Sequence, residues 1–172
     1  KGLTGGFLPL AAVLCTQAIY DGFLDDSRER AFLHSHSYTG NPLACAAALA
    51  SLAIFESDDV LARNRATASR MAELAAPLAA LPHVADVRQA GMIIAFELAQ
   101  GGDTRTPFDP SLRVGLRAYR AALANVSANT GVVLRPLGDT LYWMPPYCID
   151  DAQLQLLARV TRDAIIEATA CA

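Results

Sequence analysis

Charged residues are scarce in this chain: they make up only 18% of its 172 residues, against 53% hydrophobic residues. A composition this apolar can bury a substantial core, which excludes an intrinsically disordered chain. The net charge is −3, and the basic residues are scattered along the sequence rather than gathered in one stretch. We therefore expect no positive surface of the kind that binds nucleic acid.

Cysteine pairs and long apolar runs are also missing. The four cysteines include no C-x-x-C pair, and three of them lie in apolar stretches. This favours buried free thiols in a reducing compartment over a disulfide framework. The apolar run from Phe7 to Leu14 is about eight residues long, which is too short to cross a bilayer. We therefore expect a cytoplasmic protein without membrane contact.

No initiator methionine opens the sequence, and Lys1 is the only positive charge before the first apolar run. Both features argue against a signal peptide. They lead us to expect further sequence upstream of Lys1, so that this chain is a fragment.

Apolar patterning predicts alternating strands and helices, and hence an α/β or α+β fold. Residues 8–16 form a short apolar stretch bounded by glycine, as in a buried strand, and Thr16 is placed to cap a short helix to residue 24. Asn41 and Pro42 open a long helix as its cap and first-turn residue. Because this helix is almost wholly apolar to about residue 56, it is expected to be buried on most sides.

Beyond residue 58 the helical pattern becomes amphipathic, which marks a change from a large core to a smaller layer. The later elements follow from periodicity and turn residues. We expect an amphipathic segment over 58–81, strand character over 84–98 around Gly91, a loop over 101–110, a helix over 112–128, strands over 132–135 and 141–144 with a turn at Gly138–Asp139, and a closing helix over 150–169.

Lys1 precedes a loop with glycines at positions 2, 5 and 6. Such a loop lets a bulky planar ligand approach the backbone. A lysine beside it and beside an apolar segment can be partly desolvated, which makes its amine nucleophilic towards carbonyls. The alternative is a lysine that lies exposed in a turn, and spacing alone does not exclude it.

The densest polar cluster is the block HSHSYTGNP, from His34 to Pro42. His34 and His36 could bind a metal, but H-x-H is a weak signal and no third ligand follows at suitable spacing. Hydroxyl groups and backbone amides just before the N-terminus of a long helix instead suit a phosphate.

Arg135 follows the apolar residues 132–134, and the run YWMPPY begins at Tyr142. An arginine at the end of a strand that enters a core rarely lies there without a carboxylate partner. That partner could be a carboxylate of the protein itself, in a structural salt bridge, or the carboxylate of a substrate. The aromatic residues of the run could form the walls of a pocket or simply belong to the core.

Four blocks of the sequence, taken in order, resemble a known family. They are KGLTGGFLPLAAVLCT, HSHSYTGNPLACAAALASLAIFES, VADVRQAGMIIAFEL and GVVLRPLGDTLYWMPPY. Together they resemble the class III aminotransferases, the ornithine and omega-amino-acid type enzymes that use pyridoxal 5′-phosphate (PLP). The fourth block carries the pattern R-P-x-x-x-x-x-Y-x-M-P-P-Y, and it is most similar to the members of the family that act in biotin biosynthesis.

The resemblance implies the type I fold of PLP-dependent transferases, which is an α/β fold. Residues 1–57 would form the C-terminal part of the large PLP-binding domain, and residues 58–172 the small C-terminal α+β domain. The family's aspartate for the pyridine nitrogen, its ring-stacking aromatic residue and its glycine-rich phosphate loop all lie upstream of the lysine. This chain is therefore expected to be active only together with an N-terminal segment.

The resemblance also implies roles for residues of the first two blocks. Lys1 would be the catalytic residue, which holds PLP as a Schiff base. Ser37, at the usual threonine position, would bind the cofactor phosphate of the neighbouring subunit, with His36 in the same cofactor site. Ser35 and His36 replace the more common Gly and Ser or Pro, so that Ser35 is expected to shape the substrate pocket.

In the fourth block, Arg135 would hold the substrate carboxylate and Tyr142 would line the pocket close to it. The implied enzyme is a homodimer with a shared site, and it aminates 8-amino-7-oxononanoate with S-adenosylmethionine or another amino donor. Two alternatives stay open. One is another omega-aminotransferase that acts on ornithine, 4-aminobutyrate or a diamine, and the other is a non-catalytic fold or assembly module in which Lys1 is merely exposed.

Overall fold

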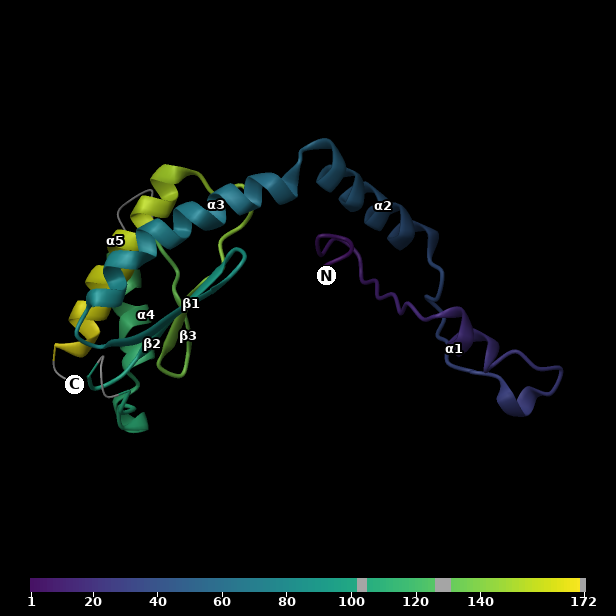
Figure 1. Ribbon diagram of the computed structural model, residues 1–172, viewed down its shortest axis with the longest axis horizontal. Helices are drawn as coiled ribbons and strands as arrows, with labels where there is room; N and C mark the ends of the chain where they lie inside the picture. The colour runs from purple at the N-terminus through teal and green to yellow at the C-terminus, as the bar shows by residue number, and fades with distance from the viewer. Residues whose placement is uncertain (102–104, 126–130, 171–172) are drawn as a thin grey trace. The chain divides into compact units, whose positions relative to one another are not determined.

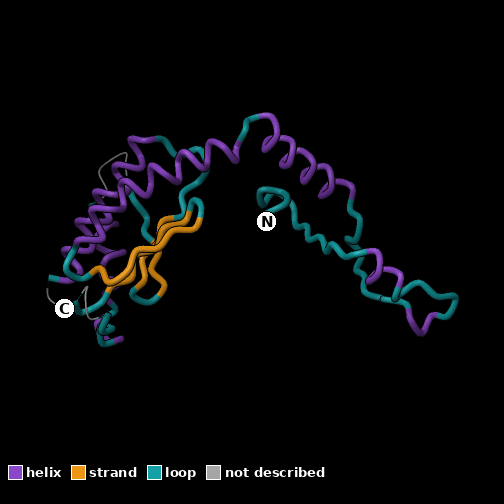
Figure 2. The backbone as a smooth tube through the Cα atoms, viewed as in Figure 1, coloured by secondary structure: helices purple, strands orange, loops and turns teal. Residues whose placement is uncertain are grey.

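The computed structural model describes residues 1–101, 105–125 and 131–170. The chain divides into two compact units, Lys1–Val60 and Leu61–Ala172. Figure 1 labels their helices and strands, and Figure 2 distinguishes helix, strand and loop along the backbone. Within the described ranges, no helix is both long and apolar enough to span a membrane.

The first unit is built from the helices α1 (Gln17–Asp21) and α2 (Pro42–Ser57) and a 3-10 turn, η1 (Arg28–Arg30). The side chain of Thr16 caps α1 by accepting a hydrogen bond from the backbone N–H of Ile19. Asn41 caps α2 in the same way through the N–H of Leu43, and Pro42 takes the first helical position. Both predicted helix starts are confirmed, because capping depends on residues only two or three positions apart.

The predicted strand over residues 8–16 is wrong. All residues of this unit are described, and none of them forms a strand. Val13 and Leu14 are 94% exposed instead of buried. An apolar stretch becomes a strand only where another strand pairs with its backbone groups, and this unit offers no such partner.

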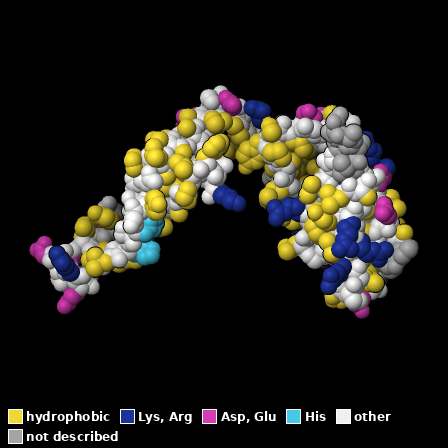
Figure 3. Space-filling model, turned by 180° about the vertical axis from the view of Figure 1, so that it is seen from behind, with side chains coloured by type: hydrophobic (Ala, Val, Ile, Leu, Met, Phe, Trp, Pro, Cys, Tyr) yellow, Lys and Arg dark blue, Asp and Glu magenta, His cyan; other side chains and the backbone are white. Residues whose placement is uncertain are grey.

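Helix α2 also departs from the expectation that it is buried on most sides. Only Ala44 and Ala48 of this helix are buried, whereas Leu43 and Leu49 are about 70% exposed. Apolar side chains accordingly cover the visible face of this helix (Figure 3). The first unit contains no sheet or second long helix that could cover them.

The cysteines are a further correction. Cys15, Cys45 and Cys148 are free, as expected, but they are exposed rather than buried. Cys171 lies outside the described residues. Apolar neighbours in the sequence predicted burial. Cys15 and Cys45 instead lie in segments whose residues are mostly exposed, and Cys148 lies in an exposed turn.

The second unit holds a four-stranded antiparallel sheet of order β1-β2-β4-β3. Its strands are β1 (Val84–Ala90), β2 (Ile93–Leu98), β3 (Arg135–Leu137) and β4 (Thr140–Trp143). Its helices are α3 (Val60–Ala75), α4 (Val114–Ala124) and α5 (Asp151–Thr169), with the 3-10 segments η2 (Ala76–Ala80) and η3 (Pro110–Leu112). Figure 1 shows α3, α4 and α5 gathered on one side of the sheet.

The segment with strand character around Gly91 forms a hairpin of two strands. Ala90 pairs with Ile93 at its end, and Gly91 has a φ of 55°. This left-handed conformation is open to glycine at little cost. The predicted strand over 132–135 begins later than expected, at Arg135, and the predicted helix over 112–128 runs from Val114 to Ala124, with residues 126–128 outside the described ranges.

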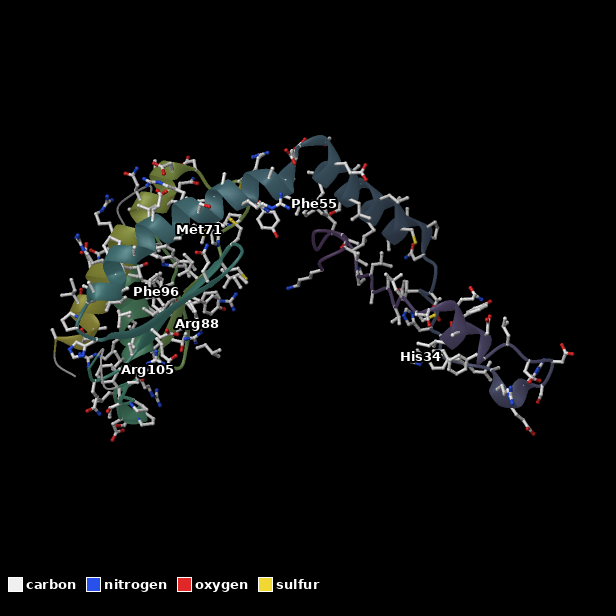
Figure 4. The ribbon with its side chains drawn as sticks, in the orientation of Figure 1. His34, Phe55, Met71, Arg88, Phe96 and Arg105 are labelled. Atoms are coloured by element: carbon white, nitrogen blue, oxygen red, sulfur yellow. The ribbon has the colours of Figure 1, made fainter. Side chains whose placement is uncertain are left out.

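The core of the second unit lies between the sheet and its helices. Alternate residues of β2 and β4 are buried, including Phe96 and Trp143, and they face Met71 of α3 in one apolar cluster (Figure 4). The rings of Phe96 and Trp143 lie 4.9 Å apart in a tilted arrangement. The indole N–H of Trp143 donates to the buried hydroxyl of Thr161 on α5 at 2.9 Å, so its one polar atom is satisfied.

Candidate active-site residues

Lys1 begins a tightly folded loop. Its carbonyl oxygen accepts hydrogen bonds from the backbone N–H groups of Thr4, at 3.2 Å, and Gly6, at 3.0 Å. Gly5 and Gly6 have φ values of 62° and 87°, which residues with a Cβ rarely adopt. Thr4 is 2% exposed and its hydroxyl donates to the carbonyl of Leu8. The loop therefore fixes the backbone of Lys1 while its side chain lies exposed.

The polar block before α2 forms a second closed loop around Thr39. The Thr39 hydroxyl oxygen lies 3.1 Å from the backbone N of His36 and 3.3 Å from the Ser35 hydroxyl, and it accepts from both groups. The backbone N–H of Tyr38 donates to His36 Nδ1 at 3.1 Å, so a neutral His36 ring carries its proton on Nε2. Ser37 lies at the centre of this loop and is exposed.

This loop leads directly into α2. Gly40 has a φ of 70°, and Asn41 then caps the helix. Hydroxyl and amide donors of residues 35–39 thus precede the positive end of a 16-residue helix, an arrangement that favours an anion.

His34 and His36 were weak candidates for metal ligands. Within the described part of the chain, no group of three or more His, Cys, Asp or Glu side chains could hold a metal ion. The ring of His34 instead lies 5.6 Å from that of Phe32.

Arg135 and Tyr142 face each other across the hairpin of β3 and β4. They are direct partners in the antiparallel register. The guanidinium carbon of Arg135 lies 5.9 Å from the centroid of the Tyr142 ring, within the range of a cation–π contact. Residues seven positions apart in the sequence therefore form one pair.

This pair lines a cavity of about 470 Å³ with mostly apolar walls. Further lining residues come from the segment before β3, from the run after β4 and from α5, among them Leu134, Met144, Pro146 and Leu157. Among the described residues, no carboxylate lies within salt-bridge distance of Arg135. A cavity with apolar walls and one cation suits a ligand with an aliphatic body and a carboxylate.

The structure thus brings five of the six sequence-predicted site residues together in two groups, and no described contact joins Lys1 to either group. Ser35, His36 and Ser37 share one loop of the first unit, and Arg135 and Tyr142 share one hairpin of the second. Sequence reasoning missed Thr39, to which two members of the first group bond. A serine and a threonine four positions apart before a helix cap were the available signal.

The family model for aminotransferase class III matches residues 1–165 of the chain. The chain belongs to this family. Class III aminotransferases depend on PLP, so that the predicted cofactor class is confirmed at the level of the family.

Curated relatives of the chain carry a more specific name. This chain is 48% identical over 170 residues to the adenosylmethionine-8-amino-7-oxononanoate aminotransferase of Nitratidesulfovibrio vulgaris. The aligned region covers 98% of this chain and 30% of that protein. The enzyme of the same name from Geobacter sulfurreducens is 46% identical over 158 residues, with 91% and 34% coverage. The chain spans about a third of the length of these relatives.

Solved structures of aminotransferases share the fold. The adenosylmethionine-8-amino-7-oxononanoate aminotransferase of Methanocaldococcus jannaschii matches 97% of this chain and 37% of its own, with a TM-score of 0.88 and 36% identity. A PMP-bound aminotransferase of Vibrio fluvialis matches 81% of this chain and 30% of its own, with a TM-score of 0.74 and 26% identity. The predicted fold class, the type I fold of PLP-dependent transferases, is confirmed.

Proposed function

We propose that this chain supplies the lysine-bearing part of a PLP-dependent aminotransferase that converts 8-amino-7-oxononanoate to 7,8-diaminononanoate in biotin biosynthesis. The observation that carries this proposal is the match over 98% of the chain to a relative of that name. We assign residues 1–57 to the large PLP-binding domain and residues 58–172 to the small domain. We also propose that the reaction takes place in the cytoplasm.

The residues of the first unit fit the cofactor. The glycine-rich loop holds the backbone of Lys1 but leaves its side chain exposed, as a lysine that must reach a planar ring requires. Ser37 and His36 lie in a loop before the positive end of α2, where a hydroxyl and a ring N–H suit a phosphate. We propose that Ser37 and His36 bind the phosphate of the neighbouring subunit's PLP, and that Ser35 shapes the pocket next to them.

Bound PLP supplies an aldehyde that condenses with amines and a pyridine ring that takes up negative charge from the reacting carbon. The Lys1 amine would hold the cofactor through its aldehyde carbon between turnovers, and the amine of the donor would take the place of Lys1 there. Freed Lys1 would act as a general base that moves the proton from the donor's reacting carbon to the cofactor's aldehyde carbon, and in the amination half-reaction it would move a proton in the opposite direction, onto the acceptor's reacting carbon.

In the second unit, Arg135 is proposed to bind the carboxylate of 8-amino-7-oxononanoate. Two features support this role: the cavity beside Arg135 has apolar walls for an aliphatic chain, and no described carboxylate neutralises its charge. Tyr142 packs against the guanidinium and limits its orientations. Charge-assisted bonds from arginine to a carboxylate are the strong type, so this contact fixes the acceptor's orientation.

We further propose a homodimer with its sites shared between subunits, and S-adenosylmethionine or another amine as donor. Since the relatives are about three times as long, the groups that bind the pyridine ring are assigned to an N-terminal segment. The exposed apolar face of α2 is compatible with burial in such an assembly.

Transfer of an amino group to 8-amino-7-oxononanoate by the assembled enzyme tests the proposal, with S-adenosylmethionine, lysine, ornithine, 4-aminobutyrate and diamines as donors. The product 7,8-diaminononanoate is expected from the wild type and none from Lys1→Ala. Activity with ornithine or 4-aminobutyrate and their keto acids, but not with 8-amino-7-oxononanoate, would instead favour another omega-aminotransferase. Substantial turnover by Lys1→Ala would overturn the role of Lys1.

A further inference from the structure

The hairpin that carries Arg135 and Tyr142 has a two-residue turn at Gly138 and Asp139. Leu137 and Thr140 are the last paired residues on either side. Of the two turn residues, Gly138 has a positive φ, of 60°, and Asp139 does not. This is the pattern of type II′ turns, which suit the twist of paired strands. The turn lies three residues from Tyr142 and three from Arg135, so a shift of the turn moves both.

Asp139 connects this turn to two other elements. Its carbonyl oxygen accepts a hydrogen bond from the backbone N–H of Leu98, at the end of β2, at 3.0 Å. Its side-chain oxygen Oδ1 accepts from the backbone N–H of Gly115, in the first turn of α4, at 2.8 Å. This N–H is one of those that a helix cannot satisfy internally, and the positive end of the helix attracts the carboxylate.

Gly115 allows the close approach on which this contact depends. A Cβ at position 115 would lie 2.1 Å from the carbonyl oxygen of Gly138 and 3.2 Å from the Cα of Asp139. Neither atom belongs to a flexible side chain, so any larger residue at position 115 would push the turn away from α4. Helix and turn therefore hold each other in one position.

Strand β3 has few other constraints. It is three residues long and, among the described residues, lies at the edge of the sheet and pairs only with β4. Its middle residue is Pro136, which has no N–H to donate to the ladder. Short edge strands with one partner are held weakly by their own hydrogen bonds, so contacts at the turn contribute much of the constraint on Arg135.

We propose that Asp139 is a positioning residue for substrate binding, which acts by tying the β3–β4 turn to α4 and β2 and thereby fixes Arg135 and Tyr142 at the mouth of their cavity. This inference rests on the proposed function of Arg135 as the carboxylate-binding residue. Asp139 itself does not line the cavity that holds Arg135 and Tyr142. Its effect should therefore be confined to the part of the substrate that Arg135 recognises.

Steady-state kinetics of the assembled holoenzyme with 8-amino-7-oxononanoate and with its methyl ester test this inference, since the ester lacks the carboxylate. Asp139→Ala should raise the KM for the acid by about tenfold or more, because small misplacements of binding groups are costly. Its kcat, and its KM for the ester, should stay within about twofold of the wild-type values. Asp139→Asn, which keeps an acceptor oxygen for the Gly115 N–H, should recover most of the loss.

Asp163→Ala is the matched control, because the Asp163 side chain on α5 is 45% exposed and pairs only with its neighbour Arg162 among the described contacts. It should leave both KM values unchanged. In a double-mutant cycle, Asp139→Ala should add little to the KM of an Arg135→Gln variant, since the group that it positions is then absent. Equal losses for acid and ester, or fully additive losses in the cycle, would overturn the inference.

Hydrogen exchange of the backbone separates this inference from the proposed function. Asp139→Ala should accelerate exchange in a peptide spanning residues 135–142, whereas Asp163→Ala should not. Unchanged exchange there would disprove the positioning role even if the enzyme transaminates as proposed. If the wild type fails to transaminate, or Arg135→Gln leaves the KM for the acid unchanged, the proposed function fails. Faster exchange in Asp139→Ala would still show that Asp139 holds the β3–β4 turn in place.

Discussion

Arg135 is central to the chemistry that we propose for the second unit. Sequence reasoning left Arg135 with two possible partners, a structural carboxylate or a substrate carboxylate. Among the described residues it contacts a tyrosine ring and no acidic side chain, which favours the second. Tyr142 helps to keep the guanidinium in place without neutralising its charge.

The buried pair of Trp143 and Thr161 offers a test at the scale of one hydrogen bond. Thr161→Val should lower the free energy of unfolding by about 1–3 kcal/mol, because it leaves the buried indole N–H without an acceptor. Thr161→Ser keeps the hydroxyl and should cost clearly less. Urea denaturation of both variants measures the difference, and equal losses would show that packing rather than the hydrogen bond matters at this position.

Helix starts could be predicted from the sequence, whereas strand pairing could not. Thr16 and Asn41 cap their helices as expected, and Asp150 caps α5, where it forms a reciprocal capping box with Gln153. These contacts span at most three residues. The false strand over residues 8–16 and the missed hairpin at Gly91 both depended on which segments lie side by side, which local patterns do not contain.

The same limit applies to the candidate site. The family resemblance implied that Arg135 and Tyr142 line a pocket, and the local sequence predicted a turn at Gly138–Asp139. They gave no sign that Asp139 reaches Gly115, because the two residues are 24 positions apart and belong to different elements. Sequence patterns therefore pointed to side chains that lie together within one motif but were silent about contacts between motifs, and the roles of Arg135 and Tyr142 stay predictions.

A contact between α3 and α5 makes stability depend on pH. The guanidinium of Arg70 donates to Asp151 at 2.6 Å, and this hydrogen bond, followed by that from Gln155, lowers the pKa of the Asp151 carboxyl. A carboxyl whose pKa is lowered in the folded state stabilises the fold at pH values above its pKa in the unfolded state, which is about 3.9. This stabilisation is lost as the pH falls through the pKa of the folded state.

Asp151→Asn should therefore lower the free energy of unfolding at pH 7 but cause progressively less loss below about pH 4. Because the side chains of Arg70 and Asp151 are 40% and 55% exposed, solvent screens the pair, so that the effect should be small and should shrink further at high salt. Urea denaturation at pH 7 and at low pH measures it, with Asp163→Asn as the control. A loss that is the same at both pH values would contradict the account.

At the scale of the molecule, the two units differ in how completely they bury their apolar residues. The second unit has a continuous core between sheet and helices, including Met71, Phe96 and Trp143. The first unit leaves many large apolar side chains exposed, among them Phe7, Val13 and Leu14. Since the chain covers about a third of its curated relatives, this exposed surface is in keeping with the proposed assembly around the cofactor.

The central claim is that Lys1 bears the cofactor, and one feature of the composition makes it directly measurable. Lys1 is the only lysine of the 172-residue chain. Borohydride reduction of the intact enzyme, followed by mass spectrometry of its peptides, locates the lysine to which PLP is attached. We predict a phosphopyridoxyl group on the side chain of Lys1, and its presence on a lysine elsewhere in the protein, with Lys1 unmodified, would contradict the account.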